Sequence, residues 1–230
     1  MPNPTSPAGQ AVQDLRIEEA ARYALLRRLT PALRHHLIGA LQPVGMLAAM
    51  LERRAQAAQP DMPGIQKKCA DLGQLSREAT ASCVDLISWI SPKTADSVSA
   101  EDGIKECLSV LETDLALRGF STVNKSAGQT CTLARSAVRN VLTAALLALT
   151  DSVQSPHEVV LSAGTEGDLV VLSLTLTLKP REGEPMAIAN HAYRAMEWDD
   201  VLALARSESV EVEYSALRVK LVCPPGPESE

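Results

Sequence analysis

Apolar residues recur at helical spacing through the first part of the chain. Two stripes, within residues 33–51 and 65–90, advance by alternating steps of mostly three and four residues, as in the seam of a helical bundle. Only the turn sequence QPDMPG separates them. Two long helices with so short a connection predict an antiparallel hairpin. The predicted seam consists of Leu33, Leu37, Ala40, Val44, Leu47 and Leu51, facing Cys69, Leu72, Leu75, Ala79, Cys83, Leu86 and Ile90.

The helical pattern begins before this seam. Residues 1–10 are rich in Pro, Ser and Gly and predict a disordered tail, whereas residues 11–58 are rich in Leu, Ala, Arg and Glu. Thr30 and Pro31 have the form of an N-cap and a first helical residue. They predict either a short helix ending near Leu29 with a longer one after it, or one kinked helix. A hairpin domain over residues 11–92 would bury little by itself, so we expect a homodimeric four-helix bundle.

The second half has a mixed pattern, which predicts an α/β sandwich over residues 93–223. Its fold class is thus α+β, with a mostly antiparallel sheet covered by helices on one face. Residues 224–230, PPGPESE, predict a second tail. Helices are expected at 101–118, 133–151 and 198–207, and strands at 97–100, 120–124, 159–162, 169–178, 210–214 and 217–222, with GTEGD as a hairpin turn.

Composition excludes several classes of partner. The net charge is −6, no dense Lys/Arg block occurs, and aromatic residues make up 3%, so nucleic acid is not an expected partner. No apolar run approaches the roughly 20 residues of a membrane-spanning helix. The start MPNPTSPAGQ lacks the features of a secretory signal. We therefore expect no membrane association and a cytoplasmic location.

The scattered cysteines and acidic residues do not predict a metal site. Five cysteines without a C-x-x-C pair indicate reduced packing residues rather than a disulfide framework or a zinc site. Acidic residues 197, 199 and 200 precede or open a helix, where its dipole favours them. His157 and His191 lie in predicted loops and are expected to be solvated. The cysteines are Cys69, Cys83, Cys107, Cys131 and Cys223.

The most specific signal lies in the first hairpin helix, in LRHHLIGALQPVGMLAAMLERR. At about 100° per residue, His35 lies almost opposite the seam, and His36 lies on its flank. Steps of three and four residues from His35 lead to Gly39, Gln42 and Met46 on the outward face. A face of low charge with a glycine and an exposed methionine suits the docking of a partner.

The run RHHLIGALQP, residues 34–43, resembles the H-box of two-component sensor histidine kinases, with the proline somewhat later than usual. In that family a phosphoacceptor histidine lies on the exposed face of the first helix of a dimerisation hairpin. The resemblance implies that His35 is the phosphoacceptor and that His36 replaces the acidic residue that commonly follows it. The order of elements in residues 93–223 also resembles the family's ATPase domain.

The second half departs from that family at its nucleotide motifs. Ala144, within RNVLTAA, stands where the resemblance would place a magnesium-binding asparagine. TLTLKPREGEP replaces the adenine-binding Asp-x-Gly-x-Gly loop, and the glycine-rich lid has no counterpart. We therefore expect an ATPase-type shell that binds neither ATP nor a metal, and no cofactor on this chain.

Three functional classes follow from this resemblance. In the first, His35 relays phosphoryl groups between receiver-domain aspartates, His36 supports it, and Gly39, Gln42 and Met46 dock the response-regulator receiver, which supplies the magnesium. The absence of an acidic residue directly after His35 fits this relay better than autophosphorylation from ATP. The alternative is a non-catalytic pseudo-histidine-kinase module that docks a regulator. An active ATP-dependent kinase is disfavoured by the missing motifs.

Overall fold

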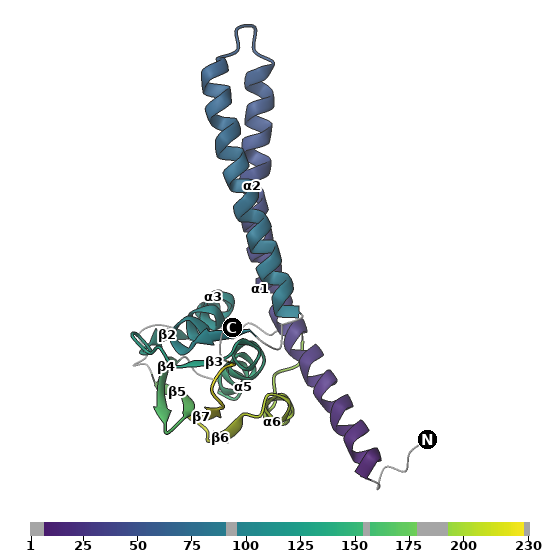
Figure 1. Ribbon diagram of the computed structural model, residues 1–230, viewed down its shortest axis with the longest axis vertical. Coiled ribbons are helices and arrows are strands. Elements are labelled where there is room, and N and C mark those ends of the chain that lie inside the picture. Colours follow the sequence, from purple (N-terminus) through teal and green to yellow (C-terminus); the bar gives the residue numbers. More distant parts are fainter. Residues whose placement is uncertain (1–6, 91–95, 154–156, 179–192, 228–230) are drawn as a thin grey trace. The chain divides into compact units, whose positions relative to one another are not determined.

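The computed structural model describes residues 7–90, 96–153, 157–178 and 193–227 (Figure 1). The chain forms two compact units. One is Thr30–Ser91, and the other combines Met1–Leu29 with Pro92–Glu230. The division therefore falls after Leu29, and the helical residues before it group with the sandwich instead of with the hairpin domain expected from residue 11.

Helix α1 (Pro7–Ala55) is one uninterrupted helix of 49 residues, so the single-helix alternative is the correct one. It begins at Pro7, inside the segment expected to be a tail. Pro31 and Pro43 both lie within it. A proline inside a helix removes one backbone hydrogen bond and favours a bend, and Pro31 follows the boundary between the two units by two residues.

The hairpin pairs the second part of α1 with α2 (Met62–Ile90). Among the described residues from 30 to 90, the buried apolar side chains are Leu47, Leu51, Ala79 and Trp89. The seam predicted on α1 is confirmed, because its other members are half-buried. On α2 the prediction was wrong at Cys69 and Ile90, which are exposed. The residue before each of them takes the seam position instead: Lys68 is half-buried and Trp89 is buried. A lysine can occupy a seam position because its methylene stem packs while its ammonium stays in water.

The sandwich contains a five-stranded sheet with the order β2-β4-β5-β7-β6. In this sheet β2 and β4 pair in parallel and the other neighbouring strands are antiparallel, and a separate two-stranded sheet joins β1 to β3. The strands are β1 (Ser97–Ser99), β2 (Ser121–Asn124), β3 (Thr132–Ala134), β4 (His157–Glu166), β5 (Leu169–Leu178), β6 (Glu211–Tyr214) and β7 (Arg218–Cys223). The protein is α+β, as expected.

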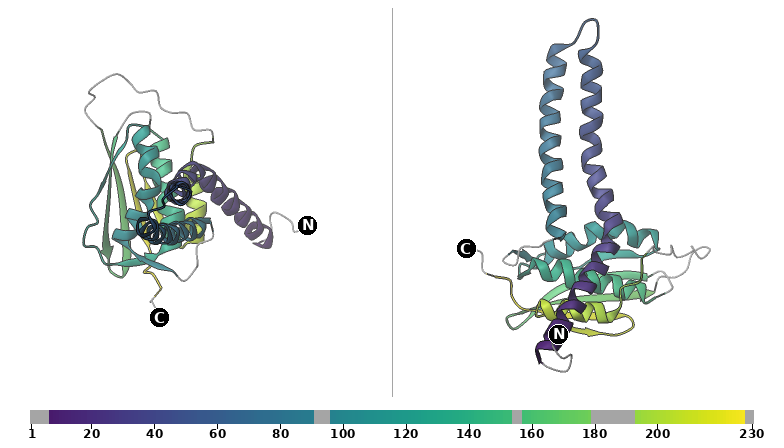
Figure 2. Two further views of the ribbon diagram at one scale, coloured as in Figure 1. Left: turned by 90° about the horizontal axis from the view of Figure 1, so that it is seen from above. Right: turned by 90° about the vertical axis from the view of Figure 1, so that its right-hand side faces the viewer.

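Helices cover one face of the five-stranded sheet (Figure 2). Alternation along the strands explains why: Val159, Leu172 and Leu221 are buried, whereas their neighbours Ser173 and Lys220 are only half-buried. Strands β4 and β5 form a long hairpin in register from the His157↔Leu178 pair to the Glu166↔Leu169 pair. The helices are α3 (Ala100–Leu117), α4 (Arg135–Ala137), α5 (Thr143–Asp151) and α6 (Trp198–Ser207).

The apolar helix expected at 133–151 has an irregular middle. Helix α4 leads into a π-helical turn, Val138–Leu142, which continues as α5. Every residue from 136 to 150 is buried. The apolar helix expected at 133–151 is thus confirmed from Arg135 onward, whereas Leu133 and Ala134 belong to β3 and the π-helical turn was not predicted.

His157 was expected to be solvated, and that expectation is wrong. It is the first residue of β4, which begins two residues earlier than predicted, and it is only 3% exposed. Its ring stacks on that of Phe120, with centroids 6.4 Å apart. His191 lies outside the described residues.

The last described residues are anchored rather than frayed. Pro225 forms a bridge with Leu133, and the backbone N–H of Gly226 donates to the carbonyl oxygen of Thr132. A Cβ added at Gly226 would lie 2.9 Å from the carbonyl carbon of Leu133, so only glycine fits this approach. The tail expected from residue 224 is therefore not observed at Pro225 and Gly226.

The cysteines divide into packed and accessible groups. All five are free; Cys107 and Cys223 are buried, as expected of packing residues, whereas Cys69 is exposed. None of the helices in the described part of the chain combines the length and apolarity needed to cross a bilayer.

Candidate functional site

His35 and His36 both lie exposed on α1, within the hairpin unit. Their ring centroids are 6.3 Å apart and the rings are nearly perpendicular, at 85°. Among the described residues, neither imidazole takes part in a hydrogen bond or an ion pair. Both rings are therefore open to solvent and can be approached by a partner.

The predicted docking residues continue along the helix from His35. Gly39, Gln42 and Met46 are all exposed, with Met46 at 66%. A Cβ added at Gly39 would meet no atom within 4 Å, so no described side chain covers that position. The structure places these residues on one open helix face.

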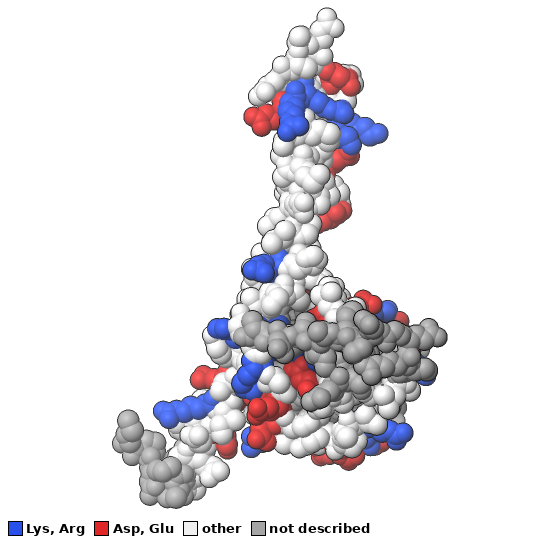
Figure 3. Space-filling view, turned by 180° about the vertical axis from the view of Figure 1, so that it is seen from behind, with Lys and Arg blue, Asp and Glu red and all other residues white. Residues whose placement is uncertain are grey.

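The face around His35 is notably poor in charge. No Asp or Glu occurs on α1 between Glu19 and Glu52. Charged side chains gather near the tip of the hairpin, and the middle of the face seen in Figure 3 is largely uncharged. A carboxylate that could accept a proton from either imidazole is thus missing from this stretch of the helix.

The hairpin also carries a second apolar stripe that the sequence prediction did not identify. Large apolar residues remain exposed on both helices, among them Ile38 at 55%, Leu41 at 47%, Val84 at 62% and Ile87 at 63%. Each residue advances about 100° around the helix axis. By this measure, the exposed apolar residues of each helix lie on the same side of that helix's seam. In an antiparallel pair these two sides form one continuous face, and Ile38 lies at the edge of it that is nearest to His35.

The sandwich lacks an open site at the position of the missing asparagine. Ala144 is 0% exposed, and its neighbours along α5 are equally buried. Asn140, one turn earlier, is committed elsewhere, because its side-chain amide donates to Glu208 at 2.7 Å. Groups of His, Cys, Asp or Glu that could hold a metal ion are absent from the described residues.

Polar side chains around the π-helical turn form ion pairs and hydrogen bonds with neighbouring side chains. Arg139 is buried and donates to Glu106 of α3 at 3.2 Å, and Arg135 pairs with both Glu106 and Asp96. The hydroxyl of Ser136 donates to Glu208 at 2.6 Å. These contacts attach the turn to α3 and to the residue that follows α6.

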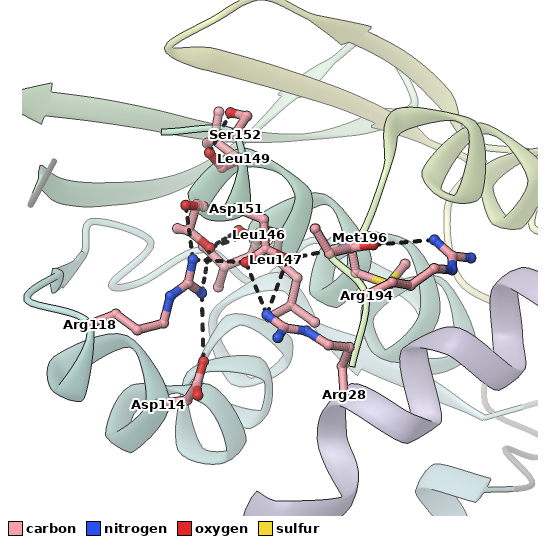
Figure 4. Close-up of polar contacts among 12 residues, drawn as sticks. Arg28, Asp114, Arg118, Leu146, Leu147, Leu149, Asp151, Ser152, Arg194 and Met196 are labelled. Carbon is pink, nitrogen blue, oxygen red and sulfur yellow. Dashed lines mark hydrogen bonds and ion pairs between the residues drawn. The ribbon is translucent and has the colours of Figure 1, made fainter. Parts of the chain in front are cut away.

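A second polar cluster centres on Asp151, at the end of α5 (Figure 4). Its carboxylate accepts from Arg28 of α1 at 2.9 Å, from Arg118 at 2.8 Å, and from the backbone N–H of Met196 at 3.0 Å. Arg118 also donates to the carbonyl oxygen of Thr150. Burial lowers the pKa of Arg28, against the opposing effect of Asp151. The cluster joins α1, the end of α3 and the end of α5.

Sequence reasoning missed this cluster, although one signal was available. Asp151 ends a helix that is otherwise almost entirely apolar, where the negative end of the helix dipole disfavours a carboxylate. Such a residue needs a cation close by. The partners themselves could not be found, because Arg28 lies 123 positions away.

Comparisons with known proteins add a likeness at the level of fold. No protein-family model and no curated relative matches the chain. The catalytic domain of histidine kinase ThkA covers 57% of this chain and 96% of its own length, with 8% identity and a TM-score of 0.43. The Acinetobacter baumannii histidine kinase AdeS covers 77% and 94%, with 12% identity and a TM-score of 0.42. A bacterial phosphotransferase covers 86% and 94%, with 12% identity and a TM-score of 0.38. At these values the comparisons assign no family.

Proposed function

We propose that this protein is a histidine phosphotransferase that relays phosphoryl groups between receiver-domain aspartates through His35. The observation that carries the proposal is the position of His35, exposed on an uncharged helix face opposite the hairpin seam. The H-box-like run RHHLIGALQP supports the same residue. Gly39, Gln42 and Met46 continue that face and form the proposed docking surface for a response regulator.

The chemistry needs little from this chain beyond an accessible nucleophile. An unprotonated ring nitrogen of His35 attacks the phosphorus of an aspartyl phosphate; a nitrogen–phosphorus bond forms as the phosphorus–oxygen bond to the carboxylate breaks. The aspartate leaves with the electron pair. A second receiver's aspartate then reverses the exchange. The receiver brings the magnesium and the acidic pocket, and docking supplies the alignment that lowers the barrier.

The second apolar stripe supports a homodimer as the working form. A hairpin of residues 30–90 that buries four apolar side chains has too small a core to be stable alone. Packing Ile38 and Leu41 of one copy against Val84 and Ile87 of another would cover the stripe. His35 would then face outward from the four-helix bundle and remain accessible.

The proposal excludes ATP as the phosphoryl donor. The place of a magnesium-binding asparagine is taken by Ala144, whose buried side chain has no oxygen to offer a metal. The neutral helix face around His35 also lacks the carboxylate that orients the imidazole during attack on ATP. The phosphoryl group must therefore come from another protein.

The test is phosphoryl transfer from a panel of phosphorylated receiver domains to the full chain. We expect acid-labile, base-stable label on wild-type protein and on His36→Gln, and none on His35→Gln. His36→Gln is a matched control, because the two histidines are adjacent and equally open. Label that persists in His35→Gln would overturn the assignment of the residue.

A non-catalytic docking module is the second candidate, favoured by the absence of any hydrogen-bond partner for either imidazole among the described residues. It predicts that His35→Gln still binds the receiver with unchanged affinity and that wild-type protein never acquires label. Calorimetric titration of both variants with the same receivers separates the two functions.

A further inference from the structure

A cavity of about 410 Å³ lies between the first part of α1 and the segment that leads into α6. Its volume is within the usual range for small-molecule sites. Every part of it belongs to the unit that contains the sandwich. The lining residues are Ala20, Tyr23, Ala24, Arg27, Tyr193 and Arg194.

Arg27 is held in place by two aromatic rings. Its guanidinium carbon lies 4.2 Å from the ring centroid of Tyr193, and its Nη1 donates to the Tyr23 hydroxyl at 2.9 Å. The hydrogen bond to Tyr23 raises the pKa of Arg27. A stacked guanidinium loses less side-chain freedom when it binds, because its plane is already fixed.

The charge of Arg27 is not neutralised by the described residues. Among residues 7–90, 96–153, 157–178 and 193–227, no carboxylate pairs with it, and its polar contacts there are with the side chains of Tyr23 and Tyr193. Arg194 differs, since it donates to both carboxylate oxygens of Asp200, at 2.6 and 2.8 Å. The cavity thus contains one paired arginine and one arginine with donors to spare.

We propose that this cavity binds a small planar organic anion, a carboxylate or a phosphate ester, through Arg27. A guanidinium has five N–H donors, more than the two tyrosines use, and pairs of them have the geometry that such an anion accepts. Ala20 and Ala24 leave room beside the tyrosine rings for a flat apolar body. The site is independent of the phosphotransfer proposed for His35, and no step of that reaction uses it.

Binding there would have a structural consequence. Tyr23 and Arg27 belong to α1, whereas Tyr193 comes from the segment before α6, so an occupied site holds these two parts together. Amide exchange of residues 20–27 therefore slows when the ligand is bound. This readout does not depend on any activity of the protein.

The experiment is calorimetric titration of the full chain with benzoate, phenyl phosphate and the neutral analogue benzamide. We expect millimolar or tighter binding of at least one anion and no binding of benzamide. Arg27→Gln should weaken binding about tenfold or more, and Arg27→Lys should weaken it as well, because an ammonium neither stacks nor offers a planar fork.

Arg16→Gln is the matched control, since Arg16 is an exposed arginine of the same helix outside the cavity. It should bind as wild type does and show the same slowed exchange at residues 20–27. Unfolding curves check that each variant is folded. Binding by benzamide, equal losses in Arg16→Gln and Arg27→Gln, or no binding of either anion at millimolar concentration would each overturn the proposal.

Discussion

The guanidinium of Arg28 donates to both carboxylate oxygens of Asp151, at 2.9 and 3.1 Å, across 123 positions of the chain. Both side chains are almost fully buried, at 2% and 5% exposure. Desolvation of such a pair offsets much of its attraction. Its main effect is therefore to fix where α1 docks on the sandwich, since any other register would bury one of these charges without its partner.

Replacing Asp151 should be strongly destabilising. Asp151→Asn leaves the guanidinium groups of Arg28 and Arg118 buried without this carboxylate, which should lower the free energy of unfolding by about 3–5 kcal/mol. Urea denaturation followed by circular dichroism measures the change. The exposed Asp168→Asn is the control and should stay within about 0.5 kcal/mol of wild type. Equal effects of the two substitutions would show that the cluster does not anchor the fold.

Asp200 should make the free energy of unfolding depend on pH in the acidic range. Burial alone would raise the pKa of Asp200, but the hydrogen bonds from Arg194 and the backbone of Glu197 outweigh it and lower the pKa. A carboxyl with a lowered pKa in the folded state contributes stability above its unfolded value, about 3.9, and loses it as the pH falls through the folded value. Asp200→Asn should cost about 0.5 kcal/mol at pH 6 and progressively less towards pH 3. A difference that stays constant over this range would contradict the prediction.

Self-association should depend on the second apolar stripe. Ile38→Glu and Ile87→Glu would each bury an unpaired charge at the proposed dimer interface and weaken the dimer by roughly 3 kcal/mol, about a hundredfold. Met46→Glu, on the outward face, should leave association unchanged. Sedimentation equilibrium of the three variants and the wild-type protein measures the dimer dissociation constants. A monomeric wild-type protein would contradict the proposed four-helix bundle.

Nucleotides should not stabilise the protein. Because Ala144 is fully buried and carries no metal-binding group, we expect the melting temperature to be the same with and without magnesium and a non-hydrolysable ATP analogue. Thermal unfolding monitored at several analogue concentrations measures this. A melting temperature that rises with concentration would show that the chain retains a nucleotide site elsewhere.

The cysteines should differ sharply in reactivity. Burial raises the pKa of Cys107 and of Cys223 to about 12, so almost no thiolate forms at pH 8. Mass spectrometry after brief treatment with iodoacetamide should find Cys69 labelled and these two unmodified until denaturant is added. Early labelling of Cys107 would mean that the helix layer opens in the native protein.

The spacing of apolar residues was enough to predict most elements. The α1 seam follows from alternating steps of three and four residues, and α6 begins where the acidic residues predicted it, with Glu197 and Asp200 forming a capping box. These features are local, so a short window of sequence contains all the information. The same window could not decide at Pro31, where the sequence allowed either two helices or one and the structure has a single helix that continues through the proline.

The candidate site divides in the same way. The exposure of His35, Gly39, Gln42 and Met46 depends only on helical periodicity and was predicted correctly. The cavity around Arg27 and the cluster around Asp151 were not predicted, because each brings together residues from distant segments. The burial of His157 was missed for the same reason, since Phe120, which covers it, belongs to another part of the chain.

The sequence by itself determined the helical hairpin, the mixed sheet and the outward face of α1, because each depends on side-chain periodicity along a single element. Only the tertiary structure decided that α1 belongs to two units, that Arg28 docks on Asp151 and that Arg27 faces Tyr193. These contacts depend on which charged and aromatic side chains come together when the sandwich folds. The residues are distant in the sequence, so no local pattern predicts the contacts.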